Sequence, residues 1–113
     1  MCNEVLVFTA VGVPQIVSRA IEEFATRQGS LTALVVPWES DGVTLSMSVT
    51  FAKPVGQATE HTNLGTIRLT DLGSDLTRVE IAAHQPDHAE KQKLAALFDG
   101  FASRVQSKFE VAS

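Results

Sequence analysis

The stretch that decides the fold is TIRLTDLGSDLTRVEIAAH, residues 66–84, in which two runs of alternating apolar and polar residues flank a glycine-containing turn. This pattern is typical of two antiparallel strands joined by a short loop. A three-residue loop over 73–75 sets Leu72 opposite Leu76, and it sets the core-side pairs Leu69–Val79 and Ile67–Ile81. The same register places Arg68 opposite Glu80 on the other side of the hairpin, where opposite charges attract. Burial and charge therefore predict one register.

After this hairpin the chain changes to the 3.6-residue spacing of a long terminal helix, predicted over roughly 88–110. Asp87 is a candidate N-cap residue because Glu90 follows three positions later, as in a capping box. The apolar stripe of this helix consists of Leu94, Leu97, Phe98, Phe101, Val105 and Phe109. A helix of this length extends about 33 Å, which is enough to lie across a whole sheet.

The residues before the hairpin predict further strands and one more helix. Residues 3–11 and 30–38 are rich in β-branched and other apolar residues and are predicted strands. Between them, Pro14 begins a helix whose apolar stripe comprises Ile16, Val17, Ala20, Ile21 and Phe24. In VTLSMSVTF, residues 43–51, apolar residues alternate with serine and threonine. This alternation predicts a strand with one core face and one polar face.

Residues 52–57 are predicted to form a loop, and residues 58–63 a weak, polar edge strand. The predicted element order is therefore β-α-β-β-β-β-β-α. This order describes an α+β domain in which an antiparallel sheet packs against the long C-terminal helix.

The composition predicts a single folded domain over residues 1–113, because 44% of the residues are hydrophobic and 19% are charged. The formal net charge of -4 has the wrong sign for a general phosphate-backbone binder, so no nucleic acid partner is expected. Cys2 is the single cysteine, which excludes an internal disulfide and a cysteine-based metal site and favours a cytoplasmic location. The longest apolar runs are far shorter than the ~20 residues of a membrane span, so no membrane association is expected.

The LTDLGSDLTRVEIAAH hairpin with its Thr-Arg-Val step, followed by a helix with spaced Leu and Phe residues, resembles the START-like helix-grip superfamily. That superfamily includes polyketide cyclase/dehydrase relatives and lipid-transfer domains, and the resemblance is best over residues 64–110. It implies a sheet that curls around the terminal helix and leaves a hydrophobic cavity for a small apolar ligand. Residues 12–30 leave room for one helix where the family commonly has two, which makes this chain a short member. A different small α+β arrangement, of the kind that pairs through its sheet, is the alternative.

The sequence contains no P-loop, GxGxxG, HExxH, CxxC or GxSxG motif. The three histidines, His61, His84 and His88, are interpreted as solvated residues of polar strands or of a helix start. No metal, cofactor or catalytic residue is therefore expected. Whether the chain is an enzyme stays open, but a binding protein is favoured. A small lyase or cyclase needs a buried polar group in its cavity, and the sequence offers no convincing one.

The residues predicted to line the cavity are Trp38, Met47, Phe98 and Phe101, since aromatic and methionine side chains bring large, adaptable contact area. The alternative interpretation is that they fill the core. The leading functional hypothesis is non-covalent binding of a small hydrophobic molecule between the sheet and the terminal helix. The competing hypothesis is a protein-interaction or homodimerisation module with a filled core, which would use the polar face of residues 43–51 or the edge at residues 58–63.

Overall fold

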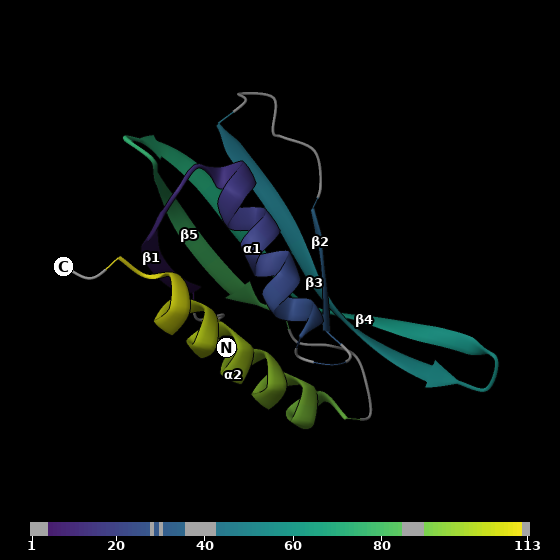
Figure 1. The fold of residues 1–113 in the computed structure, drawn as a ribbon. Helices are drawn as coiled ribbons and strands as arrows, with labels where there is room; N and C mark the ends of the chain where they lie inside the picture. The colour runs from purple at the N-terminus through teal and green to yellow at the C-terminus, as the bar shows by residue number, and fades with distance from the viewer. Residues whose placement is uncertain (1–4, 28, 30, 36–42, 85–89, 112–113) are drawn as a thin grey trace.

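The computed structural model describes residues 5–27, 29, 31–35, 43–84 and 90–111, and it confirms an α+β fold. Its elements are β1 (Val5–Val11), α1 (Pro14–Thr26), β2 (Leu31–Val35), β3 (Thr44–Val55), β4 (Ala58–Gly73), β5 (Leu76–Ala83) and α2 (Lys91–Phe109) (Figure 1). These strands form one antiparallel sheet in the order β1-β5-β4-β3-β2. Both helices pack on the same face of the sheet, α1 over β2 to β5 and α2 against β1, β5 and β4 (Figure 1).

The sequence predicted six strands, and the described residues form five. Residues 58–63 and the first strand of the hairpin are not separate, because both belong to the 16-residue strand β4. The pairing of β4 with β5 begins only at Gly65. Within the described sheet, residues 58–63 therefore pair with β3 alone and have the edge position that their polar sequence indicated.

The predicted loop over residues 52–57 was wrong. β3 continues through Val55, and Gly56 and Gln57 alone form the turn to β4. Pro54 suggested a loop, but this part of β3 pairs with β4 and not with β2. A proline is tolerated there because a strand with one neighbour has a free side on which no amide donor is needed.

The hairpin of β4 and β5 has the predicted register, with the ladder pairs Ile67–Ile81, Leu69–Val79 and Arg68–Glu80. Its loop differs from the predicted one. Ser74 and Asp75 form a two-residue turn with φ values of 56° and 59°, as the tight turns of hairpins require. Gly73 takes the place of Leu72 opposite Leu76. Leu72 becomes an extra residue, and its insertion keeps the rest of the ladder in the register that a three-residue loop would set.

The core lies between the two helices and one face of the sheet, and β3 shows the predicted alternation. Leu45, Met47 and Val49 are buried, and Phe51 packs against the core from a half-buried position. The prediction was wrong for Val43, which lies just before the strand and is 41% exposed.

The first helix buries a slightly different stripe from the predicted one. Val17 and Ile21 are buried as expected, but Ile16 is 64% exposed because the helix turns Ser18 toward the sheet in its place. Ser18 can be buried there because its hydroxyl donates a hydrogen bond to the carbonyl of Gln15 at 2.9 Å.

The C-terminal helix α2 lies within its predicted span and confirms its predicted stripe. Its buried residues are Leu94, Phe98, Phe101, Ala102 and Val105. Glu90 occupies the N-cap position, and the candidate cap Asp87 lies outside the described residues. Phe24 of α1 stacks on Phe101 with ring centroids 5.8 Å apart and meets Phe109 edge-on at 6.3 Å. These aromatic contacts join the two helices above the sheet.

A bulge in β4 bends the sheet beside α2. Val49 pairs with Gly65 and the next residue of β3, Thr50, pairs with Asn63, so Leu64 is an extra residue in β4. Beyond the bulge, β3 and β4 continue as a ribbon that projects from the body, and the ribbon is two-stranded after Phe51, where the pairing of β3 with β2 ends (Figure 1). This ribbon, residues 50–63, gives the molecule its elongated shape of 47 × 26 × 26 Å.

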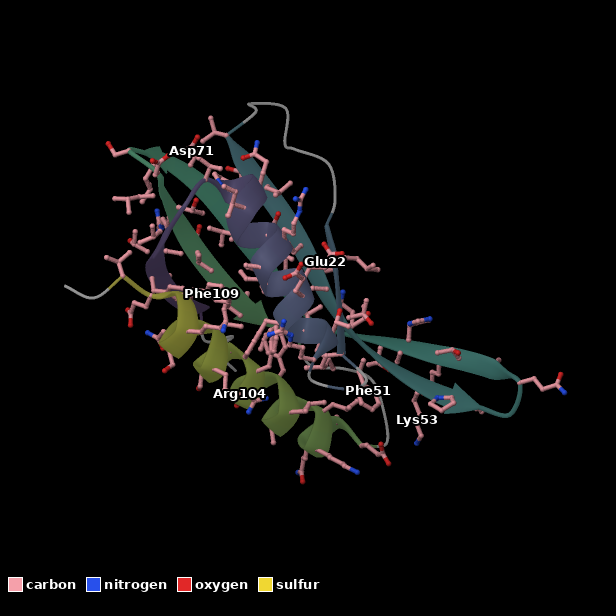
Figure 2. All side chains as sticks on the ribbon, in the orientation of Figure 1. Glu22, Phe51, Lys53, Asp71, Arg104 and Phe109 are labelled. Carbon is pink, nitrogen blue, oxygen red and sulfur yellow. The ribbon has the colours of Figure 1, made fainter. Side chains whose placement is uncertain are left out.

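Close packing fixes α2 at the bulge. A Cβ atom at Gly65 would overlap the ring of Phe98 and would lie 2.5 Å from the carbonyl oxygen of Ala82. Only glycine therefore lets the helix approach the sheet this closely. Lys53 projects from the ribbon (Figure 2), and its Nζ lies 3.7 Å from Oε1 of Glu90 at the start of α2.

Candidate functional site

A groove lies between α2 and the β1–β5 end of the sheet. It is lined by Leu6 of β1, Ile81 and Ala83 of β5, and Phe98, Asp99, Ala102 and Ser103 of α2. Its volume is about 330 Å³, and it opens to solvent. The four helical residues share one flank of α2 because residues three and four positions apart are neighbours on a helix. A space of this size is at the small end of the ~300–1,000 Å³ range of small-molecule sites.

The floor of the groove is apolar. Ile81 and Phe98 are each 2% exposed, and Leu6, which pairs directly with Ile81, packs against the core. The space beside them exists because two of the lining residues are alanines, Ala83 and Ala102. A longer side chain at either alanine would occupy the groove.

One wall of the groove is polar. Asp99 and Ser103 stand one helical turn apart on α2, and both are exposed at the opening. Across the described ranges, neither side chain has a hydrogen-bond or ion-pair partner. The arrangement can therefore hold an apolar body on the floor and a polar head at the wall.

The structure brings one of the predicted cavity residues, Phe98, to this groove. Met47 and Phe101 have no exposed surface and lie in the core. Phe24 of α1 stacks on Phe101, so the space beside this ring is filled by another aromatic side chain. Trp38 lies outside the described residues. Contact of these side chains with a ligand stays a prediction.

Sequence reasoning missed the sheet side of the groove and its polar wall. The missed residues are Leu6, Ile81, Ala83, Asp99, Ala102 and Ser103. One signal was present in the sequence, because Ala83 ends the apolar face of a strand and Ala102 lies within the otherwise bulky apolar side of the helix. The signal became interpretable only with the pairing of β1 and β5, which joins distant parts of the chain.

The other polar candidates do not converge on a site. His84 is exposed, and its Nε2 lies 2.9 Å from Oγ1 of Thr66, whereas His61 is on the exposed ribbon and His88 is outside the described residues. The buried hydroxyl of Thr77 donates to a backbone carbonyl at 2.7 Å. In the part of the chain that is described, no group of three His, Cys, Asp or Glu side chains is placed to hold a metal ion. No described helix combines the length and the apolar character that a membrane crossing needs.

Comparison with known proteins gives one likeness of fold. No protein-family model matches the chain, and no curated protein matches it. Among solved structures, the chain is similar to a START superfamily protein from Mycobacterium smegmatis, at 11% sequence identity and a TM-score of 0.37, over 93% of this chain and 94% of that chain. The chain's own elements show the predicted arrangement of an antiparallel sheet with a long C-terminal helix on one face.

Proposed function

We propose that the chain binds a small, mainly apolar molecule non-covalently in the groove between α2 and the β1–β5 end of the sheet. The observation that supports this most directly is the apolar floor of Leu6, Ile81 and Phe98 beside an opening to solvent. Transfer of apolar ligand surface from water to this floor would drive binding.

The size of the groove sets the expected affinity. A ligand with one aromatic ring and a short chain removes about 300 Å² of apolar surface from water, counting both partners, and gains about 7 kcal/mol. The loss of translational and rotational freedom offsets at least about 4 kcal/mol of this gain. The remainder is at most about 3–4 kcal/mol, which corresponds to a Kd of about 1 mM or weaker, so binding experiments need millimolar probe concentrations.

Substitution of Ala102 by leucine is expected to abolish binding, because the longer side chain would fill the groove beside Phe98. Phenylpropanol at about ten times its Kd should stabilise the unsubstituted protein by about 1.4 kcal/mol, by mass action. The rise in Tm should be several degrees in that protein and absent in the Ala102→Leu variant.

The matched control for this experiment is Ala96→Leu, which adds the same side chain at an exposed position of α2 away from the groove. Its response to phenylpropanol should equal that of the unsubstituted protein. An equal response in both leucine variants would place the ligand elsewhere and contradict the proposed site.

A second candidate function is homodimerisation through the face of the sheet opposite the helices, which neither described helix covers (Figure 1). That face carries Val7, Thr9, Leu34, Ser46, Ser48, Thr66, Arg68, Thr70, Arg78 and Glu80. Val7 is 45% and Leu34 55% exposed, and the mixed charges allow a second copy to pair with the first about a two-fold axis. Strand spacing and length give about 500 Å² per copy, or about 1,000 Å² in total. This area is the minimum for a specific interface, so a weak dimer is expected.

Introduction of arginine at both Ser46 and Ser48 is expected to make the protein monomeric at every concentration, because like charges would face each other across the two-fold axis. Sedimentation velocity over a concentration series is the measurement, and Ser107→Arg on the exposed side of α2 is the control. If the unsubstituted protein sediments as a monomer throughout the series, the second candidate is wrong.

A further inference from the structure

We infer that the groove selects ligands with a cationic amine head on an apolar body, of which an arylalkylamine is the simplest example. The inference rests on the proposed function and adds the chemical class of the ligand. It follows from the position of Asp99 and Ser103 on one wall of an otherwise apolar space.

The geometry separates the groove into a body site and a head site. Asp99 and Ser103 come from the flank of α2, whereas the sheet side contributes the apolar side chains Leu6, Ile81 and Ala83. A ligand whose ring lies on the floor therefore directs its head toward α2. A carboxylate accepts hydrogen bonds and donates none, and an ammonium group brings three donors and no acceptor.

The carboxylate of Asp99 has no compensating cation in the described part of the chain. The positions one turn before and after it on α2 hold Ala95, Ala96, Ala102 and Ser103, which are all uncharged. Arg104 does not serve as a partner, because its guanidinium lies over Gly100, where a Cβ atom would be 3.3 Å from Nη1. An unpaired carboxylate at the opening of the groove would attract a cationic ligand head.

The expected preference is modest because Asp99 is exposed to solvent. Exposed ion pairs change affinity by about two- to fivefold. An amine should therefore bind about two- to fivefold more tightly than the alcohol of the same skeleton, and repulsion of similar size should weaken the corresponding carboxylate.

The test uses three soluble probes that share one ring and chain: phenylpropylamine, phenylpropanol and phenylpropanoate. Each is titrated into the full chain at neutral pH, and the Kd is taken from saturable NMR shifts of the Leu6, Ala83 and Phe98 amides. The expected order of affinity is amine, then alcohol, then carboxylate.

Asp99→Asn should lower the affinity for the amine to that for the alcohol, because the amide keeps the shape of the side chain without its charge. Asp75→Asn at the tip of the hairpin is the matched control. It removes one negative charge from an exposed position that does not line the groove, and it should leave the order of the three probes unchanged.

The outcomes distinguish failure of the ligand class from failure of the groove as a binding site. Equal affinity for the three probes, or an amine preference that persists in Asp99→Asn, overturns the ligand class while the groove stands as the binding site. Absence of saturable shifts with all three probes overturns the proposed function and the ligand class together.

Discussion

Replacement of Gly65 by alanine is expected to destabilise the protein by about 3 kcal/mol, the upper end of the range for overpacked cores. The added methyl group would meet the ring of Phe98 on one side and the carbonyl oxygen of Ala82 on the other. Relief of the overlap requires the ring of Phe98 to leave its packed position or α2 to shift, and the carbonyl belongs to the β5 backbone. The measurement is urea denaturation, in which the midpoint should fall with little change in slope.

The same substitution at Gly100 is the matched control. A Cβ atom there meets only the flexible end of Arg104, and alanine favours a helix over glycine by up to about 1 kcal/mol, so this variant should be neutral or more stable. In a Phe98→Leu background, Gly65→Ala should cost less, because one of its two obstacles is smaller. If Gly65→Ala unfolds at the same urea concentration as the unsubstituted protein, the described contact between α2 and β4 is wrong.

Truncation of Phe101 to alanine is expected to cost about 3–5 kcal/mol, as for other fully buried phenylalanines. Phe101 has no exposed surface and packs against Phe24 at 5.8 Å and Phe98 at 6.3 Å between ring centroids. A loss of this size is a large part of the ~5–15 kcal/mol that stabilises a typical domain. The denaturation midpoint should fall sharply, and the transition should begin at low urea.

The half-buried Phe109, which meets the same Phe24 ring, is the control for Phe101. Phe109→Ala should cost clearly less, because part of its surface is already in water. This comparison also bears on the two interpretations of Phe101. A ring that only lined a ligand cavity would have fewer packing partners, so a cost below about 1.5 kcal/mol would argue against the filled core.

The elements that could be predicted from the sequence are those that local periodicity determines. The register of Ile67 against Ile81 followed from alternation and charge, and the buried stripe of α2 followed from its helical spacing. Ile16 was assigned to the buried stripe by its apolar side chain alone. Near the start of α1, Ser18 is buried and Ile16 is exposed, and helical spacing did not distinguish these two positions. The loop at residues 52–57 was misassigned because Pro54 is a signal of local conformation, whereas its place in β3 depends on which neighbours the strand has.

The candidate site was predicted least well, because it is a property of the assembled chain. Phe98 was identified as an apolar residue of the helix, but the groove also needs Leu6 and Ala83, which meet only when β1 adds to the edge of β5. The bulge at Leu64, which lets Gly65 pass beneath the helix, has no separate sequence signal. The position of α2 across the sheet, and therefore the groove, follows from these long-range pairings.

The ribbon of residues 50–63 is expected to open more easily than the body of the molecule. No side chain from Phe51 to Asn63 is buried, and the exposed ion pair of Lys53 with Glu90 adds at most about 1 kcal/mol to its attachment. The extra residue at Leu64 interrupts the ladder between this segment and the body. Local opening can therefore spread from the tip of the ribbon and stop at the bulge. The amides of the ribbon should exchange with a smaller opening free energy than those of the packed helices and the rest of the sheet, which open only on global unfolding.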